Sequence, residues 1–411
     1  MFLRLAAKSL LYRKGSVLLT IFAMSVSIIV MLGVEHVRLQ AKTSFANSVS
    51  GVDLIVGART GKLNLLLYSV FRMGAPTNNI SWQSYQRLAE NKAVSWSLPI
   101  SLGDSHKGYR VLGTTPEYFD HFSYGSKQAL AFDKGRGFDS VFEVVLGAKV
   151  AEALGYQLGD SITLSHGIGA TSFSHHDQTP FSIVGILMPT GTPVDQTLHV
   201  SLQGLEAVHS ANPAGILALK EGQALSLGEH KQLEPKSITA VMVGLKSRMM
   251  VFQLQRQINT DNSEPLVAIL PGVALAELWQ SMSVVENTLR LISLMVVVSA
   301  LLGLSAMLLS SIKERHQEIK LLRMIGASPL FIYWFIELEA LLITLVSSII
   351  AIGILMLGLL LASDYLLHTY GLVITSNVLS VTGLKGLSLI FLFAFIAALP
   401  PALNAFVDAK N

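Results

Sequence analysis

Four long apolar stretches dominate the pattern of hydrophobic and polar positions along this chain. They contain no Asp, Glu, Lys or Arg and comprise 20, 22, 24 and 22 residues: Gly15–Val34, Leu291–Ile312, Ala340–Ser363 and Gly386–Val407. A helix needs about 20 apolar residues to cross the hydrocarbon core of a bilayer. The pattern therefore predicts four transmembrane helices, with one large segment of mixed composition between the first and the second.

The composition fits a membrane protein, because 51% of the residues are hydrophobic and 14% are charged. Within segment 37–283, Lys and Arg balance Asp and Glu at 19 against 19, so the net charge of +3 comes from the rest of the chain. A nucleic-acid-binding surface would need a clustered basic face, and this pattern argues against a nucleic-acid partner. The lack of cysteine indicates only that the large segment uses no disulfides.

Basic residues mark one end of each apolar stretch. Arg4, Lys8, Arg13 and Lys14 precede the first stretch. Lys313, Arg315, Lys320 and Arg323 lie between the second and the third, and Lys410 follows the fourth. By the positive-inside rule these segments are cytoplasmic. We therefore expect a multi-pass protein of the inner membrane, with cytoplasmic termini and a large periplasmic domain. The first stretch lacks a small-residue cleavage site, which predicts a retained anchor.

The predicted organisation is an α-helical membrane protein with a large α+β extracytoplasmic domain between helices 1 and 2. An amphipathic cytoplasmic helix (1–14) is followed by membrane helix 1 (15–36), the outer domain (37–283) and membrane helix 2 (284–312). A cytoplasmic segment (313–329), helix 3 (330–363), an outer loop (364–385), helix 4 (386–407) and a cytoplasmic tail (408–411) complete the chain. Residues 35–48 and 273–290 have helical patterns that prolong helices 1 and 2. They predict a stalk, and two helices lying on the bilayer are the alternative.

Inside the outer domain, strand and helix patterns interleave, which predicts an α+β fold in two lobes. The expected strands are Val52–Val56, Val94–Ser101, Tyr109–Gly113, Phe142–Leu146, Ser161–Ser165, Phe181–Leu187, Thr197–Leu202, Ser237–Gly244 and Leu266–Leu270. The expected helices are Trp82–Asn91, Ala148–Leu154, Leu202–Ser210 and Arg248–Asn259. Segment Thr115–Gly137 is assigned to the second lobe.

The sharpest motif is KERHQEIKLLRMIGASP, residues 313–329, on the predicted cytoplasmic side. A short helical run in it ends at Gly326, and Pro329 follows. Leu321, Leu322, Met324 and Ile325 form an apolar patch among basic residues. Such a patch suits the groove of a partner protein. A helix resting on lipid headgroups is the alternative.

This motif closely resembles the signature of the FtsX/MacB-type ABC transporter permeases. The matching residues are Glu318, Ile319, Leu321, Leu322, Arg323, Ile325, Gly326 and Ala327. Residues 144–164, VVLGAKVAEALGYQLGDSITL, and the following 181–202 resemble elements of the family's extracytoplasmic domain. The tail LPPALNAFVDAKN resembles the family's closing segment, although Leu399 replaces the usual aromatic residue.

The resemblance implies that the eight matching residues couple the permease to an ATPase. It further implies a pair of permease protomers, a homo- or heterodimer, that transmits ATP-driven motion to the periplasmic domain. The implied substrate is a lipoprotein, peptide or amphiphile. Membrane lipid and a periplasmic or outer-membrane protein are further partners to expect. The alternatives are a non-transporting regulator of an envelope hydrolase and a metal-linked envelope component.

Nucleotide chemistry is expected in a partner chain. The nearest string to a P-loop, Gly57-Ala-Arg-Thr-Gly61-Lys62-Leu63, is one residue short and lacks the Ser or Thr that would bind Mg²⁺. We interpret it as a turn. We therefore expect no cofactor and no catalytic residue in this chain, with ATP and Mg²⁺ bound by a separate ATPase.

Two further groups of polar residues are candidates. His175, His176 and Asp177 supply imidazole and carboxylate ligands suited to Zn²⁺, although a polar loop between strands is favoured. Glu337 and Glu339 precede the third apolar stretch. We expect them at a hydrated membrane boundary, in contact with the coupling segment or headgroups rather than in a proton relay.

Overall fold

The structure is a computed structural model that describes residues 10, 12–166, 180–209, 227, 233–314, 321, 323–324, 326–370, 378 and 380–410. The chain forms two compact units. We call residues 1–41, 282–366 and 374–411 the helical unit, and residues 42–281 and 367–373 the sheet unit.

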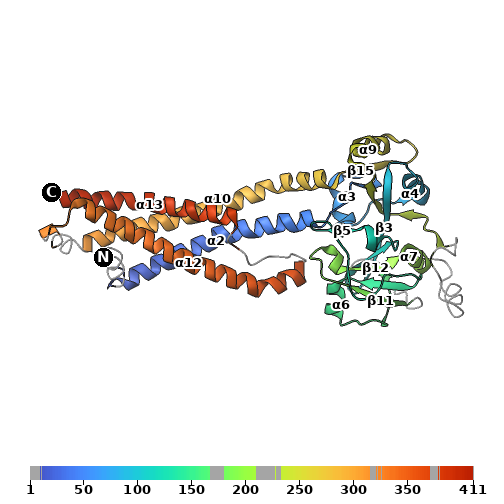
Figure 1. Ribbon diagram of the computed structural model, residues 1–411, viewed down its shortest axis with the longest axis horizontal. Coiled ribbons are helices and arrows are strands. Elements are labelled where there is room, and N and C mark those ends of the chain that lie inside the picture. Colours follow the sequence, from blue (N-terminus) through green and yellow to red (C-terminus); the bar gives the residue numbers. More distant parts are fainter. Residues whose placement is uncertain are drawn as a thin grey trace. The chain divides into compact units, whose positions relative to one another are not determined.

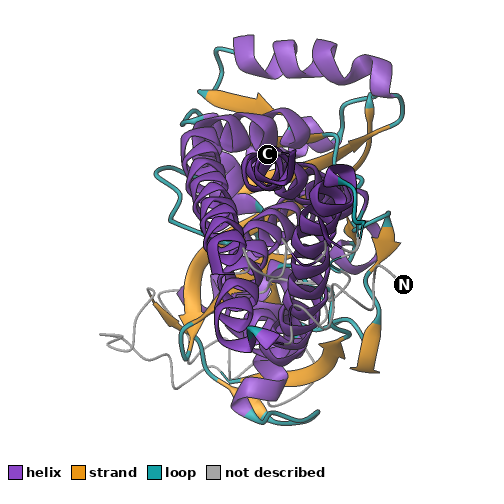
Figure 2. Ribbon diagram, turned by 90° about the vertical axis from the view of Figure 1, so that its left-hand side faces the viewer, coloured by secondary structure: helices purple, strands orange, loops and turns teal. Residues whose placement is uncertain are grey.

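Four long helices contain the four predicted apolar stretches. They are α2 (Lys14–Asn47), α10 (Pro271–Glu314), α12 (Pro329–Tyr370) and α13 (Val381–Lys410) (Figure 1). Figure 2 views these helices nearly along their axes. Within the described residues, these four are the helices long and apolar enough to cross a membrane. The prediction of four such helices is confirmed.

Inside the helical unit, small and hydroxylated residues bring the helices close together. The Ser25 hydroxyl of α2 donates to the Ser347 carbonyl of α12 at 3.2 Å, and the Ser347 hydroxyl donates back to the Ile21 carbonyl at 3.3 Å. Ala351 on α12 and Ala394 on α13 are also fully buried. Small side chains allow helix backbones to approach, and hydroxyls can then bond across the gap.

The sheet unit contains an 11-stranded mixed sheet, and nine of its strands follow the order β15-β1-β14-β3-β4-β12-β8-β11-β7. Their bounds are β1 Leu54–Ala58, β3 Val94–His106, β4 Tyr109–Thr114, β7 Phe132–Gly135, β8 Glu143–Leu146, β11 Phe181–Leu187, β12 Thr197–Ser201, β14 Ala240–Leu245 and β15 Leu266–Ile269. Short strands β9 (Ser161–Ile162) and β10 (Ser165–His166) pair with β11 and β3. Two pairs, β4–β12 and β8–β11, are parallel, and the others are antiparallel.

Smaller elements complete this unit. The remaining strands are β2 (Ile80–Ser81), β5 (Ser123–Tyr124), β6 (Gln128–Ala129) and β13 (Ser237–Ile238). The helices are α3 (Lys62–Ser69), α4 (Trp82–Ala89), α5 (Tyr118–His121), α6 (Ala148–Leu154), α7 (Leu202–His209) and α9 (Val251–Thr260), with the 3₁₀ turns η1 (Pro193–Gln196) and η3 (Arg248–Met250).

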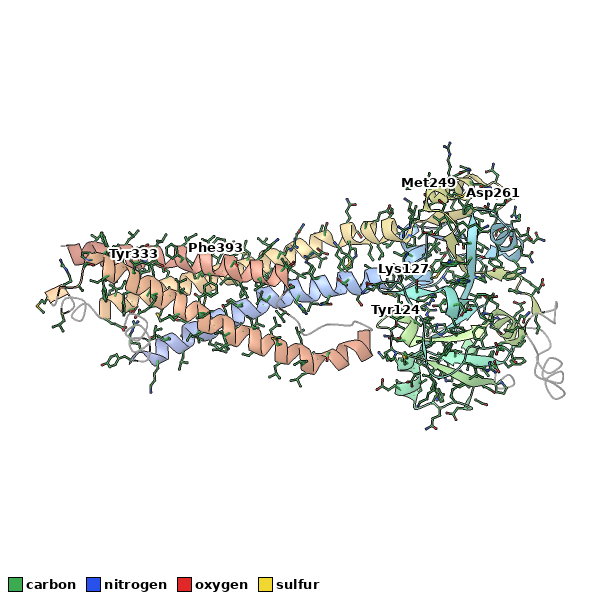
Figure 3. All side chains as sticks on the ribbon, viewed as in Figure 1. Tyr124, Lys127, Met249, Asp261, Tyr333 and Phe393 are labelled. Carbon is green, nitrogen blue, oxygen red and sulfur yellow. The ribbon has the colours of Figure 1, made fainter. Side chains whose placement is uncertain are left out.

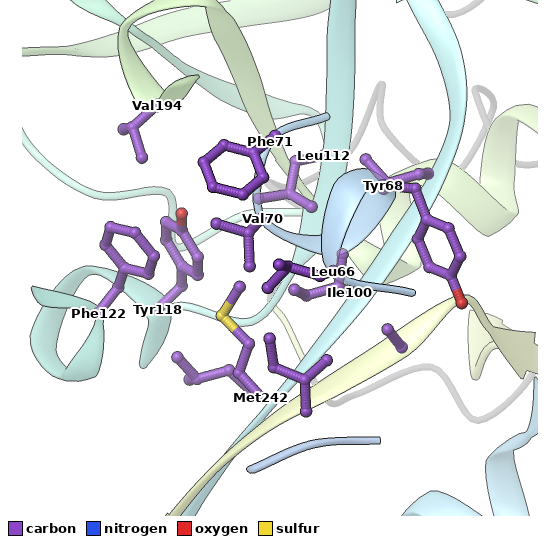
Figure 4. Packing of buried hydrophobic residues seen from close by; sticks show 14 of the residues in the cluster. Leu66, Tyr68, Val70, Phe71, Ile100, Leu112, Tyr118, Phe122, Val194 and Met242 are labelled. Atoms are coloured by element: carbon purple, nitrogen blue, oxygen red, sulfur yellow. The ribbon is translucent and has the colours of Figure 1, made fainter. Parts of the chain in front are cut away.

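The largest buried cluster among the described residues of the sheet unit joins one face of the sheet to α3 and α5. Leu66, Phe71, Leu112, Tyr118 and Met242 all contribute to it (Figure 4). Two further clusters lie around β8, β11 and β12, and around β1, β14 and β15. The expected two lobes therefore share one sheet. The 13-residue strand β3 joins them, since its first half pairs with β14 and its second half with β4.

The motif in residues 144–164 is explained by its glycines. Gly147 separates β8 from α6, and a Cβ there would lie 2.3 Å from the Val194 carbonyl oxygen, so only glycine fits. Gly155 ends α6 with a left-handed φ of +68°, the conformation that favours glycine at a helix C-terminus. The motif is thus a strand, a helix and a turn, and it packs closely against η1 because Gly147 has no side chain.

Two helices extend into the predicted outer loop 364–385, and one of them is α13, which begins at Val381 rather than at residue 386. Helix α12 continues to Tyr370, into the predicted outer loop 364–385, because no Gly or Pro interrupts the sequence before Gly371. The string Gly57–Leu63, interpreted as a turn, contains the bend at Arg59 and Thr60, with the end of β1 before it and the start of α3 at Lys62 after it.

Candidate functional site

An ion-pair cluster joins α2 to α10 directly after the first apolar stretch. The Arg38 guanidinium forms a two-pronged contact with Glu35 of its own helix, with N–O distances of 3.1 and 2.6 Å. Its other terminal nitrogen lies 3.1 Å from the Glu286 carboxylate of α10. Arg290 of α10 lies 3.6 Å from Glu35. We call Glu35, Arg38, Glu286 and Arg290 the charge clamp.

The charge clamp is built from residues one helical turn apart. Glu35 and Arg38 are spaced i, i+3, and Glu286 and Arg290 are spaced i, i+4, so each pair lies on one helix face. The side chains of Glu35, Arg38 and Glu286 are each less than a quarter exposed. Paired guanidinium–carboxylate contacts of this kind hold two helices at a fixed rotation and register. Sequence reasoning missed the clamp, because Arg38 and Glu286 are 248 positions apart.

Helices α2 and α10 also contact each other at their ends inside the sheet unit. Phe45 packs edge-on against Trp279, with ring centroids 5.7 Å apart. The Lys42 ammonium lies 6.0 Å from the same indole centroid, a distance compatible with a cation–π contact. Ion pairs of the charge clamp, aromatic packing and a cation–π contact therefore all link α2 to α10.

Described residues of the helical unit line two cavities relevant to ligand or helix binding. One, of about 470 Å³, lies between α2 and α10 and has small residues such as Ala23, Ser299 and Gly303 along it, with Arg13 and Glu314 at one end. The other, of about 340 Å³, is mostly apolar and includes Leu32, Leu39 and Leu294. Both are large enough to accept a side chain or part of an acyl chain.

The coupling segment is only partly described. Leu321 is 56% exposed and Met324 is 76% exposed, and Arg323 is exposed as well. Gly326 has a left-handed φ of +98° and its amide donates to the Arg323 carbonyl, which ends the helical turn. Ala327 is partly buried. Glu318, Ile319, Leu322 and Ile325 lie outside the described residues.

After Gly326 the chain enters α12 through a well-formed helix start. The Ser328 hydroxyl accepts the Phe331 amide at 3.2 Å, and Pro329 occupies the first helical position. This is the residue choice that helix N-termini favour. The described part of the segment thus presents apolar side chains on a short turn fixed at its α12 end.

The two acids of α12 are buried inside the protein. Glu337 is 0% exposed, and Glu339 is almost fully buried. They are buried with apolar neighbours along the helix, Ile336 and Ala340. The expectation that these acids are hydrated is wrong, because a pattern of charge does not show which face of α12 packs against other helices, whereas their contact with the coupling segment or headgroups stays a prediction.

The metal hypothesis stays a prediction. His175, His176 and Asp177 lie outside the described residues, and the described ranges contain no group of three or more metal-ligating side chains.

Two family models match this chain. The family model of the MacB-like periplasmic core domain matches residues 16–260, and that of the FtsX-like permease C-terminal domain matches residues 290–406. Among solved structures, the periplasmic region of MacB from Actinobacillus actinomycetemcomitans is similar at 12% identity, over 57% of this chain and 94% of that chain, with a TM-score of 0.36. The extracellular domain of the noncanonic ABC-type transporter YknZ from Gram-positive bacteria is similar at 13% identity, over 53% and 98%, with a TM-score of 0.29.

The search of curated proteins found no match. The two family models together cover both the sheet unit and the helices that follow it. The chain therefore belongs to the MacB/FtsX-type family of ABC transporter permeases.

Proposed function

We propose that this permease transmits motion, driven by ATP hydrolysis in a separate ATPase subunit, to its sheet unit on the periplasmic side of the inner membrane. The observation that carries the proposal is the pairing of two uninterrupted helices, α2 and α10, by the charge clamp. At 1.5 Å per residue, 34 and 44 residues give lengths of about 51 and 66 Å, well beyond the roughly 30 Å of a hydrocarbon core. Continuous paired helices carry a displacement from one end to the other.

In this proposal the ATPase docks on the cytoplasmic segment 313–329 and binds all ATP and Mg²⁺. The exposed apolar side chains of Leu321 and Met324 supply the contact, as apolar anchors do in helix-in-groove recognition. The basic residues around them support a cytoplasmic position for this segment and for both termini. The sheet unit, between the first two spans in sequence, then lies outside.

A second permease protomer is proposed to pack along the cavity between α2 and α10. Its small lining residues, including Ala23 and Gly303, leave room for an approaching helix. Either a second copy of this chain or a related permease would fit this arrangement.

The proposed substrate is an amphiphilic molecule, such as a lipoprotein or lipidated peptide, taken from the outer leaflet or the periplasm. The apolar cavity that includes Leu32, Leu39 and Leu294 favours this choice over a purely regulatory role. It has apolar walls together with the charged residues Glu35, Arg290 and Lys385, so it suits a molecule with an acyl chain and a polar headgroup.

The docking proposal is tested with Leu321→Asp combined with Met324→Asp. Both side chains are exposed, so the fold should tolerate the change, while a charge in an apolar contact should weaken docking by about 2 kcal/mol or more, roughly thirtyfold. The measurement is recovery of vanadate-sensitive ATPase activity with the tagged chain from membranes in mild detergent.

The matched control is Met249→Asp, which adds a carboxylate at a 90% exposed methionine in the sheet unit. It should retain the ATPase. If the double variant also retains a fully active ATPase, segment 313–329 does not dock it.

A further inference from the structure

A cavity of about 320 Å³ in the sheet unit combines two arginines with aromatic walls. Four chain segments line it: the end of α2, the turn after α3, the β3–β4 hairpin turn and η1 with the start of β12. All four belong to the sheet unit. The cavity is separate from the coupling segment and from both cavities of the helical unit.

Arg72 supplies an unusual buried cation at this cavity. Its residue is only 8% exposed, and burial lowers the pKa of its guanidinium. One terminal nitrogen donates to the Ser69 carbonyl, whereas Nε has no hydrogen-bond partner within the described residues. A buried polar group without a partner costs free energy, so native proteins usually satisfy it with protein, water or a ligand.

The backbone at Arg72 is equally unusual. Its φ is +59°, and the Met73 amide donates back to the Leu67 carbonyl across the end of α3. This is the helix ending that normally places glycine at the left-handed position. An arginine there accepts a strained backbone, which is a feature that clusters at ligand-binding sites.

Arg110 gives the cavity its second cation. One of its terminal nitrogens donates to the Gly74 carbonyl, which leaves other donors of the five-donor guanidinium for a ligand. The described residues that line the cavity include no Asp or Glu. The cavity therefore carries uncompensated positive charge.

The remaining walls are apolar or aromatic. Phe45 and Phe71 pack together with ring centroids 4.8 Å apart, and Met73 and Tyr109 also line the space. Ser48 and Thr197 add hydroxyls. A volume near 320 Å³ lies at the small end of ligand pockets.

We infer that this cavity is a binding site for a small organic carboxylate that bears an aromatic or short acyl group. Arg72 and Arg110 bind the carboxylate, as guanidinium groups do in preference to ammonium groups. Phe45, Phe71 and Met73 contact the apolar part. The site lies wholly within the sheet unit, and it is an additional binding function that does not depend on the ATPase coupling proposed above.

The test is a ¹⁹F NMR titration of the full chain in lipid nanodiscs with 4-(4-fluorophenyl)butyrate, with empty nanodiscs subtracted. The neutral probe 4-(4-fluorophenyl)butanamide has the same shape without the charge. We expect saturable binding of the carboxylate and affinity for the amide at least about tenfold weaker, the usual effect of losing charge-assisted hydrogen bonds. Equal binding of the two probes, or no saturable binding of either, would overturn the inference.

Three variants separate the site from general effects on the fold. Arg110→Gln should weaken carboxylate binding about tenfold. Arg72→Gly should abolish it while relieving the left-handed backbone, since glycine adopts φ of +59° without strain. Met73→Trp should block the cavity from an exposed position, and Met249→Trp is its matched control with unchanged binding. If Met73→Trp and Arg110→Gln both bind as the wild type does, the probe is bound elsewhere.

Discussion

His199 illustrates how a single buried residue sets a pH response in the sheet unit. Its ring is fully buried and lies 5.3 Å from the Tyr118 ring and 6.0 Å from the Phe119 ring, centroid to centroid. Burial, together with the nearby Arg72 cation, lowers the pKa of its imidazole to about 3. In the unfolded chain a histidine has a pKa of about 6.5. The unfolded state therefore binds a proton below that pH that the folded state does not.

This pKa difference predicts that stability is full above pH 6.5 and falls as the pH decreases from about 6.5 toward 3. His199→Leu removes the titrating group, so its unfolding temperature should decline less steeply between pH 6.5 and 4 than that of the wild type. The measurement is thermal unfolding of the full chain followed by tryptophan fluorescence. Met249→Leu, which changes an exposed side chain that does not titrate, is the control and should keep the wild-type slope. Parallel slopes for His199→Leu and the wild type would contradict the argument.

Among single residues, those that could be predicted from the sequence belong to a local pattern of neighbouring positions. Leu321 and Met324 were predicted as an apolar patch, and both are exposed in the structure. Arg72, Arg38 and His199 gave no local signal. Their importance comes from partners such as Glu286, which are distant in sequence and meet only in the folded chain. The burial of Glu337 was missed for the same reason.

Among the elements, α2 and α10 are the pair on which the proposed mechanism depends. Arg38→Lys keeps the charge but loses the planar fork that contacts Glu35 and Glu286, and Arg38→Gln loses both. Because hydrogen bonds to charged groups contribute about 1.5–3 kcal/mol, we expect the two helices to separate or rotate more freely in Arg38→Gln than in Arg38→Lys.

The chain lacks native cysteine, so spin labels can be placed directly at Val37→Cys on α2 and Val285→Cys on α10, two exposed positions. We expect a narrow distance distribution in the parent chain, a broader one in Arg38→Lys and the broadest in Arg38→Gln. Lys14→Gln, at an exposed cation on the same helix, should leave the distribution narrow. Identical widths in all four proteins would mean that the clamp does not restrain the helices.

The secondary structure of the sheet unit was largely predictable, because alternation and turn residues are local signals. Strand β11 has the predicted bounds Phe181–Leu187, and α6 has the predicted bounds Ala148–Leu154. Helix α3 was missed, because Gly57 and Gly61 drew attention to a turn and hid the run of leucines after Lys62. The joining of two expected lobes by β3 was also missed, since pairing with β14 and β4 is a long-range property.

At the scale of the whole molecule, the chain is an ABC transporter permease with two regions that match different family models. The helical unit supplies the spans and the proposed ATPase contact. The sheet unit supplies the proposed periplasmic working surface and the carboxylate site. Helices α2, α10 and α12 each continue from the helical unit into residues of the sheet unit, and α2 and α10 are the pair joined by the charge clamp. The proposed mechanism therefore depends on transmission of motion along α2 and α10 from the coupling segment to the sheet unit.

The most direct test attaches an environment-sensitive fluorophore to Val285→Cys on α10, in the complex that co-purifies with its ATPase in nanodiscs. The label lies far along α10 from Glu314, where the helix reaches the coupling segment. We predict that ATP with vanadate changes the fluorescence, and that Leu321→Asp combined with Met324→Asp abolishes the change. An unchanged signal in a complex that hydrolyses ATP would contradict the account, because the nucleotide state would not reach α10.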